Sequence, residues 1–195
     1  MIDQPTITDG VVWLTPLTHA DGAALGEFNL DDDHRRWFDQ PPVDPDPAAR
    51  RRHGEEVVER WQHGWTTGEE LTFAVRLAAD GEAIGMAELQ PGPEGRADIS
   101  YSIVPAHRRN GYAARAVRLL SDVGLGELGF RWIELRCDAE NVVLGANGRA
   151  RRVHLRADRP GRRVVRARRG LGRRPSRRAG VSTAPDSIDG LGSPR

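Results

Sequence analysis

The sequence has no lysine, so all 29 of its basic residues are arginines. Together with the heavy use of alanine, glycine and proline, this bias indicates a GC-rich genome. The chain also has only one cysteine, Cys137, which excludes an internal disulfide and suits a reducing compartment. We therefore expect a cytoplasmic protein.

Long apolar runs and leader signals are missing as well. No segment has the roughly 18 consecutive apolar residues that a transmembrane helix needs, so we expect no membrane partner. The opening residues 1–5 show no basic stretch followed by an apolar run, and no signal peptide is expected. The histidines and acidic residues match no known spacing of metal ligands, and we predict no metal site.

The net charge of +1 hides a sharp division along the chain. Residues 1–148 hold 14 Arg against 25 acidic residues, a net charge of −11, whereas residues 149–195 hold 15 Arg against 3 acidic residues, a net charge of +12. A change of this size marks a boundary. Because the apolar periodicity stops near Val143, we expect residues 144–195 to form a disordered tail, first Arg-rich and then Ser/Pro/Gly-rich.

Before this boundary, the apolar pattern predicts an α/β arrangement. Strands are expected at residues 11–14, 71–77, 83–89, 97–104 and 131–137. Helices are expected at residues 18–25, 47–62 and 112–128. The acidic run Asp31–Asp33 is expected to be loop, and the Asp80-Gly81 turn favours an antiparallel meander of the three middle strands. The final strand-helix-strand unit favours a parallel pair of strands.

The stretch Ile103–Ala113 leaves a strand, crosses a short turn and enters a helix. Backbone N–H groups at such a junction point at an anion, and the helix dipole adds to the attraction, so the junction can bind a pyrophosphate. Gly111 allows a close approach of the backbone, while Arg108 and Arg109 supply positive charge.

The residues of this turn match a known family motif. Arg108–Ala113 fits the pyrophosphate loop Gln/Arg-x-x-Gly-x-Gly/Ala of the GNAT superfamily of acetyl-CoA-dependent N-acetyltransferases. The chain resembles the branch that contains the ribosomal-protein alanine N-acetyltransferases. Ile99–Pro105 looks like the family's fourth strand, Asp138–Asn141 like the end of its fifth strand and the following Asn, and Val12–Leu17 is typical of the branch.

The resemblance covers roughly residues 8–143 and implies a fold, a cosubstrate and a reaction. The implied fold is a mixed, mostly antiparallel central sheet flanked by helices over residues 1–143, with the C-terminal part missing or disordered. The implied cosubstrate is acetyl-CoA, whose thioester a primary amine attacks directly, so that Cys137 needs no nucleophilic role. By the resemblance, the cofactor-binding residues are Ile103, Val104, Arg108, Arg109, Asn110, Gly111, Tyr112, Ala113 and Asn141.

The sequence offers two candidates for the general base. Some relatives carry a Glu on the fourth strand that removes a proton through water, and Asp98 is the candidate at that place. A plain solvated strand residue is the alternative for Asp98, and Glu88 on the preceding strand is a rival base. The acid usually proposed in relatives is a Tyr after the family's Asn, but the only tyrosines here are Tyr101 and Tyr112.

Three functions are therefore considered. The first is an N-acetyltransferase acting on a small-molecule or peptide amine. The second is non-specific binding of nucleic acid by the Arg-rich tail. The third is an inactive remnant: the family's Gly-Phe pair after its next helix would fall at Arg152 and Val153, and codons read one base out of step can restore it, which predicts a frameshift after about Val143.

Overall fold

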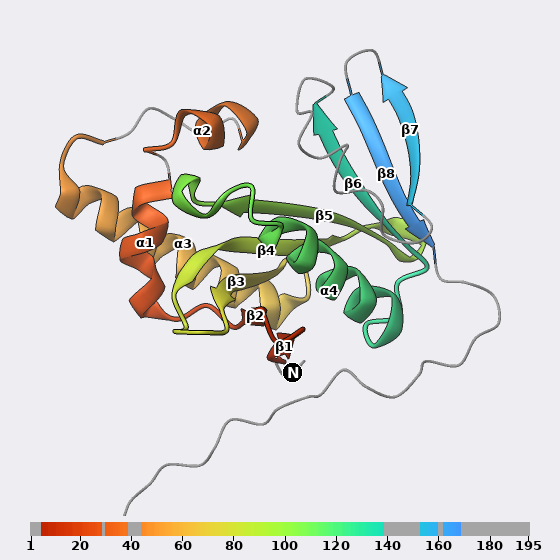
Figure 1. The fold of residues 1–195 in the computed structure, drawn as a ribbon, viewed down its shortest axis with the longest axis horizontal. Coiled ribbons are helices and arrows are strands. Elements are labelled where there is room, and N and C mark those ends of the chain that lie inside the picture. Colours follow the sequence, from red (N-terminus) through yellow and green to blue (C-terminus); the bar gives the residue numbers. More distant parts are fainter. Residues whose placement is uncertain (1–4, 29, 39–43, 139–152, 160–161, 169–195) are drawn as a thin grey trace, which may run out of the picture.

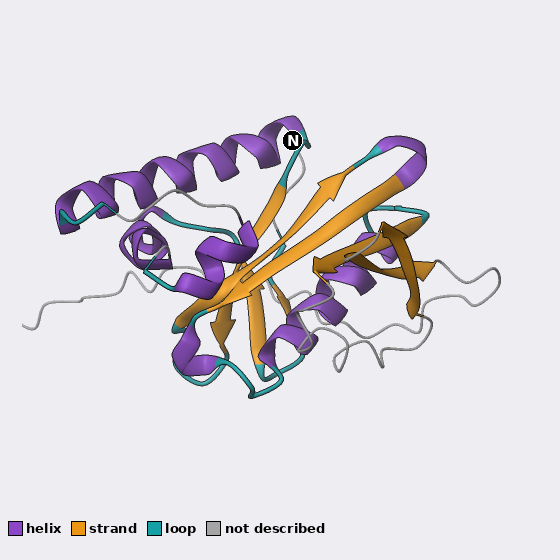
Figure 2. Cartoon of the chain, turned by 90° about the horizontal axis from the view of Figure 1, so that it is seen from above, coloured by secondary structure: helices purple, strands orange, loops and turns teal. Residues whose placement is uncertain are grey.

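The computed structural model describes residues 5–28, 30–38, 44–138, 153–159 and 162–168. Within them the strands form one eight-stranded sheet in the order β1-β2-β3-β4-β5-β6-β8-β7, with helices on both of its faces (Figures 1 and 2). The strands are β1 (Ile7–Thr8), β2 (Val12–Thr15), β3 (Leu71–Leu77), β4 (Ala83–Pro91), β5 (Arg96–Ile103), β6 (Trp132–Asp138), β7 (Val153–Arg159) and β8 (Arg162–Arg168). The helices are α1 (Gly22–Phe28), α2 (Asp32–Phe38), α3 (Pro47–Thr67) and α4 (Tyr112–Gly126), with short 3-10 turns η1 (His19–Asp21), η2 (Pro93–Gly95) and η3 (Pro105–His107).

Each pair of neighbouring strands is antiparallel except β5 and β6, which are parallel and joined through α4. The meander of β3, β4 and β5 follows the predicted order, with a turn at residues 78–80 and a bond from the Gly81 N–H to the Leu77 carbonyl at 2.9 Å. The predicted mixed, mostly antiparallel sheet with flanking helices is therefore confirmed.

Alternation along the strands divides the core into two layers. One layer, between the sheet and α4, buries Phe73, Leu89 and Leu120 completely. The other layer, between the sheet and helices α1 and α3, contains Val58 and Met86. Figure 2 shows the long helix α3 and helix α4 on opposite sides of the sheet. Burial of these apolar faces supplies most of the driving force for this arrangement.

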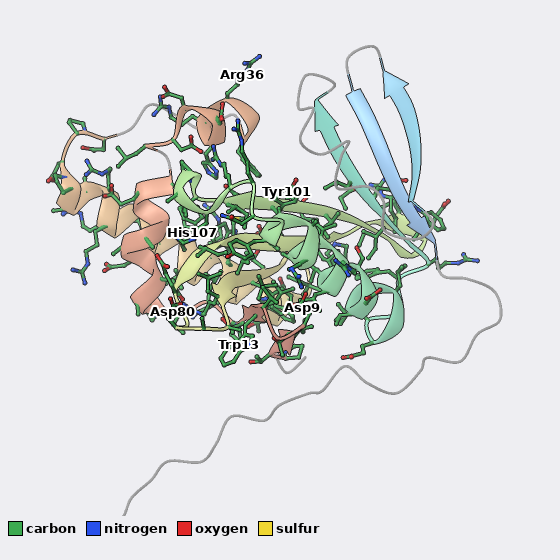
Figure 3. All side chains as sticks on the ribbon, viewed as in Figure 1. Asp9, Trp13, Arg36, Asp80, Tyr101 and His107 are labelled. Atoms are coloured by element: carbon green, nitrogen blue, oxygen red, sulfur yellow. The ribbon has the colours of Figure 1, made fainter. Side chains whose placement is uncertain are left out.

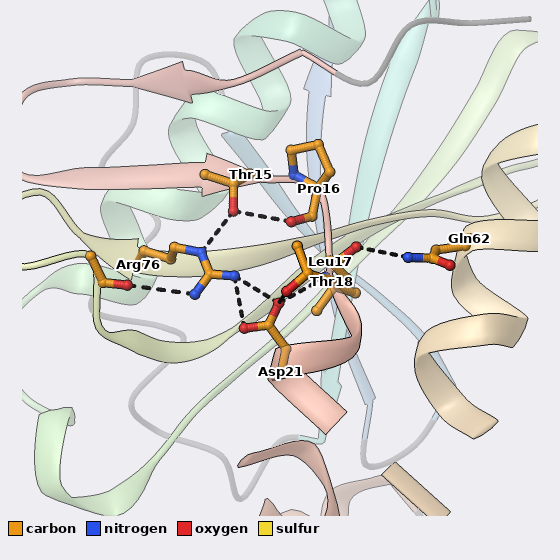
Figure 4. A network of polar contacts seen from close by, with 8 residues as sticks. Thr15, Pro16, Leu17, Thr18, Asp21, Gln62 and Arg76 are labelled. Atoms are coloured by element: carbon orange, nitrogen blue, oxygen red, sulfur yellow. Dashed lines mark hydrogen bonds and ion pairs between the residues drawn. The ribbon is translucent and has the colours of Figure 1, made fainter. Parts of the chain in front are cut away.

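A buried ion pair fixes the start of α1 against the sheet (Figure 4). Arg76 on β3 donates to both carboxylate oxygens of Asp21 at 2.7 Å and to Thr15 Oγ1 at 2.9 Å. Asp21 also accepts the Thr18 backbone N–H at 2.8 Å. Gln62 of α3 donates to the Leu17 carbonyl at 3.0 Å, so the β2–α1 connection is held from both sides.

Two segments differ from the sequence expectations. The acidic run was expected to be loop, but Asp32 and Asp33 form the first turn of α2, where carboxylates are favoured by the helix dipole, and Asp31 Oδ2 accepts the His34 N–H. Disorder was expected throughout residues 144–195, but residues 153–159 and 162–168 form β7 and β8, and β8 pairs with β6 from Trp132↔Arg168 to Asp138↔Arg162. Backbone hydrogen bonds to an open sheet edge can hold a strand without a sustained apolar pattern. The proposed frameshift junction falls within residues 139–152, which lie outside the described residues.

Among the described helices, none has both the length and the apolar character that crossing a membrane requires.

Candidate active site

Strands β5 and β6 separate halfway along β5. They are paired from Arg96↔Trp132 to Ile99↔Leu135, and within the described residues the pairing stops there. Strand β5 continues to Ile103 along β4, while β6 continues to Asp138 along β8. Figure 1 shows β6 and β8 rising away from β5. Residues 100–103 are therefore paired with β4 on one side and open on the side that β6 has left. This open side of β5 is named here the inner edge.

The register shows which backbone groups face this inner edge. Val104 N–H donates to the Ile84 carbonyl at 2.9 Å, so residues 102 and 104 direct their backbone groups towards β4. The backbone groups of Tyr101 and Ile103 consequently point to the side that β6 has left. The Val104 carbonyl accepts the His107 N–H at 3.0 Å, so both backbone groups of Val104 are used within the protein. Of the two backbone positions predicted to hold the cosubstrate, only Ile103 faces the inner edge.

The turn after β5 presents unpaired backbone donors. Arg109 and Gly111 both have left-handed backbone conformations, with φ of 66° and 78°. Gly111 is the N-cap of α4 and offers no side-chain cap, and the first bond of the helix runs from Arg115 N–H to the Gly111 carbonyl. The N–H groups of Tyr112 and Ala113 thus have no acceptor within the helix. A left-handed residue followed by a helical one makes a concave set of N–H groups that suits an anion.

Side chains stiffen the same turn. Asn110 Nδ2 donates to the carbonyls of His107 and Arg108, both at 3.3 Å, which fixes the turn from its carbonyl side. Figure 3 shows the side chains around this junction, with Tyr101 on β5 and His107 in η3. Arg109 is exposed, so its charge is available to a ligand. Arg108 instead donates to Ile103 O at 2.8 Å and pairs with the Asp31 carboxylate of the segment before α2. Asn141, the last predicted cofactor contact, lies outside the described residues.

The two candidate bases lie on the same face of the sheet, the face that α3 covers. Glu88 is directly opposite Ser100, the first residue of β5 beyond the paired segment, and Gln90 is opposite Asp98. Glu88 is 4 % exposed, and burial raises its pKa to about 8, with the neighbouring Glu70 acting in the same direction. Its Oε1 has no hydrogen-bond partner within the described part of the chain. Asp98 is more exposed and forms an ion pair with Arg96 at 3.4 Å.

A further buried group near the inner edge was missed by the sequence reasoning. His34 of α2 is buried, and its Nδ1 lies 2.9 Å from Ser102 Oγ. Its ring stacks on Phe38 with centroids 4.7 Å apart and meets Phe28 edge-on at 5.8 Å. Burial lowers the pKa of His34, Asp31 opposes this effect and Arg108 adds to it, so the imidazole is neutral near pH 7. The contact joins residues 68 positions apart in the sequence, so no local sequence pattern predicts it.

The described residues contain no group of three or more His, Cys, Asp or Glu side chains placed to hold a metal ion. The arrangement offers anion-binding amides at the α4 N-terminus, a strand edge beside them and a buried carboxyl one strand away.

Comparison with known proteins agrees with this geometry. A family model described as an acetyltransferase (GNAT) domain matches residues 12–154, while no curated protein matches the chain. A GNAT-family acetyltransferase from Bacillus anthracis is similar in structure, with a TM-score of 0.70 at 14% identity over 84% of this chain and 98% of that one. Mycobacterium smegmatis RimJ, in complex with CoA-disulfide, gives a TM-score of 0.67 at 20% identity over 84% and 85% of the two chains. RimL, a ribosomal L7/L12 alpha-N-protein acetyltransferase in complex with coenzyme A, gives 0.67 at 13% identity over 85% and 98%. At these identities the likeness shows a shared fold.

Proposed function

Since the chain belongs to the GNAT acetyltransferase family, we propose that it is an acetyl-CoA-dependent N-acetyltransferase that acts on a primary amine. The observation that carries the proposal is the separation of β5 from β6 shortly before a turn whose amides have no acceptor among the described residues. A strand edge and an anion site in this order suit a ligand with an amide-containing arm and a diphosphate. The inactive remnant and the nucleic-acid-binding tail find no support in the comparisons.

In this proposal, the diphosphate of acetyl-CoA binds to the first-turn N–H groups of α4, with Arg109 adding charge. Gly111 leaves room for the ligand, because a Cβ placed there would meet nothing within 4 Å. The pantetheine arm lies along the inner edge and pairs with the backbone N–H of Ile103, since the carbonyl of that residue already accepts Arg108 Nε. The thioester is thereby held next to Ser100, where the two strands part.

The proposed reaction is a direct transfer. The amine nitrogen attacks the thioester carbonyl carbon, the C–N bond forms, the C–S bond breaks, and coenzyme A leaves as the thiol after taking up a proton. The ammonium form of the substrate must first lose a proton to a base. Most of the rate enhancement comes from holding the amine and the thioester in contact.

Glu88 suits the role of the base better than Asp98. Its pKa of about 8 lies near the working pH, where proton transfer by a general base is most effective. Its position one strand away from the inner edge suits transfer through Ser100 or a water molecule. Asp98, paired with Arg96, is assigned to the attraction of the substrate cation.

The acceptor is proposed to be a cationic primary amine, either on a small molecule or at a peptide N-terminus. The carboxyl groups of Asp98 and Glu134 lie on one face of the sheet next to the inner edge and favour a positive charge there. The structural likeness to RimL, which is described as a ribosomal L7/L12 alpha-N-protein acetyltransferase, supports the peptide alternative.

Titration calorimetry with coenzyme A tests the binding half of the proposal. Gly111→Asp places a side chain and a negative charge where the diphosphate meets the backbone. We expect the affinity of this variant to fall by at least about tenfold, which corresponds to 1.4 kcal/mol. Gly129→Asp is the matched control, because Gly129 has the same left-handed conformation, with φ of 77°, and the same open surroundings beyond the other end of α4.

The proposal requires that the wild type and Gly129→Asp bind coenzyme A with equal affinity, and that Gly111→Asp binds it more weakly. Equal binding by all three proteins would remove the diphosphate from this turn. Absence of binding in the wild type would refute the acetyltransferase proposal itself.

A further inference from the structure

Within the described part of the chain, Arg108 is the arginine of the pyrophosphate-loop motif whose guanidinium contacts other elements. Its Nε donates to the Ile103 carbonyl at 2.8 Å, its Nη1 lies 3.3 Å from Asp33 Oδ2, and its Nη2 pairs with the Asp31 carboxylate. The side chains of Arg108 and Asp31 are 32% and 15% exposed, so the pair is partly shielded from water. The planar guanidinium thus joins the end of β5 to the start of α2.

A second connection runs between the same two elements. Asp31 Oδ2 accepts the His34 N–H at 3.2 Å, and His34 Nδ1 forms a hydrogen bond of 2.9 Å with Ser102 Oγ. Both His34 and Ser102 are buried. Since Ser102 directly precedes Ile103, the start of α2 is tied to the last two residues of β5.

We propose that Asp31, His34, Ser102 and Arg108, named here the β5 clamp, position the end of β5 for acetyl transfer. The inference rests on the function proposed above and makes Arg108 a positioning residue in place of a diphosphate ligand. The peptide plane between Ile103 and Val104 is held on one side by the clamp and on the other side by β4. Arg108 bonds the Ile103 carbonyl, and the Ile84 carbonyl accepts the Val104 N–H.

Two consequences follow for the reaction. The inner edge that pairs with the pantetheine arm is rigid at the residue nearest the turn, and a displacement of about 1 Å there can cost on the order of 100-fold in rate. In addition, Asp31 and Asp33 neutralise Arg108, so attraction of the diphosphate depends on the α4 amides and on Arg109.

Two thioesters separate positioning from diphosphate binding: acetyl-CoA, and S-acetylpantetheine, which lacks the diphosphate. With Arg108→Ala and with Asp31→Asn, we expect kcat to fall at least tenfold for both thioesters. With Arg109→Ala, the matched control, we expect a higher KM for acetyl-CoA and unchanged constants for S-acetylpantetheine. The double variant Asp31→Asn/Arg108→Ala is expected to be no worse than Arg108→Ala, because both changes break one contact.

The inference is overturned if Arg108→Ala raises only the KM for acetyl-CoA, or if Asp31→Asn behaves as wild type with both thioesters. Hydrogen exchange supplies a readout that needs no activity: amides of residues 32–38 should exchange faster in Arg108→Ala and Asp31→Asn than in Arg109→Ala or wild type. Unchanged exchange refutes the clamp even if the wild type proves unable to bind coenzyme A. If Arg108→Ala does not fold, Ser102→Ala takes its place with the same expected loss of kcat for both thioesters, and wild-type kinetics in that variant overturn the inference.

Discussion

At the scale of single residues, Glu88 links burial to chemistry. A carboxyl group that is 4 % exposed and close to a second carboxyl, Glu70, holds its proton to a higher pH than usual. Gln90 and Arg60 act in the opposite direction but do not cancel the effect. The result is a carboxyl group that changes protonation state near pH 8, inside the range in which an amine acetyltransferase would work.

The pH–rate profile of Glu88→Gln tests this assignment. We expect kcat/KM of the wild type to rise with pH and to level off above about 8, because only ionised Glu88 accepts a proton. In Glu88→Gln the rate should fall about 100-fold or more and lose the part of the rise that levels off near pH 8, keeping only the rise that comes from ionisation of the substrate amine. Asp98→Asn is the control, because it leaves Glu88 in place and should keep the whole rise. Ionisation of the substrate amine contributes equally to the profiles of all three proteins. A profile of Glu88→Gln that parallels the wild type would exclude Glu88 as the base.

At the scale of elements, the crossing of α1 and α3 depends on glycine. A Cβ on Gly54 of α3 would lie 1.8 Å from the Gly22 carbonyl oxygen and 2.7 Å from the Gly26 nitrogen, both in α1. A Cβ on Gly26 would lie 2.2 Å from the Arg50 carbonyl oxygen. The two helix backbones are therefore in direct contact. Helix α1 is followed by the segment that contributes Asp31 and His34 to the β5 clamp.

Gly54→Ala should destabilise the fold although alanine is the better helix former. Overpacking of this kind costs about 1–3 kcal/mol or more, against roughly 1 kcal/mol gained from helix propensity. Gly126→Ala, at the end of α4, is the control, since a Cβ there meets nothing within 4 Å. Thermal unfolding should show a lower Tm for Gly54→Ala and an unchanged or higher Tm for Gly126→Ala. An unchanged Tm in Gly54→Ala would contradict the close helix contact.

The elements that the sequence predicted well are those with a strong local signal. The meander around Asp80-Gly81 and the helix after Gly111 follow from apolar periodicity and from turn residues. Helix α2 was missed because Asp31–Asp33 resembles a solvated loop, whereas these acids serve the start of a helix. Strand β8 was missed because its support is pairing with β6, which no local pattern records.

At the scale of the whole molecule, the candidate site depends on contacts between distant segments. The diphosphate site at Gly111 was predicted from a motif of six residues, since such a site depends on local backbone conformation. Three features required the structure: the point at which β5 leaves β6, the orientation of Ile103 and Val104, and the partners of Arg108. The last contact joins residues 77 positions apart, and the sequence had instead assigned Arg108 to the diphosphate.

The proposed reaction transfers an acetyl group from acetyl-CoA to a primary amine. The most direct measurement incubates the purified protein with isotope-labelled acetyl-CoA and a set of peptides and small molecules with free primary amines, and follows the products by mass spectrometry. We expect at least one amine to gain a labelled acetyl group in an amount equal to the coenzyme A thiol released, and the same compound with a blocked amine to gain none. Thiol release without an acetylated amine, or release no faster than without protein, would contradict the proposal.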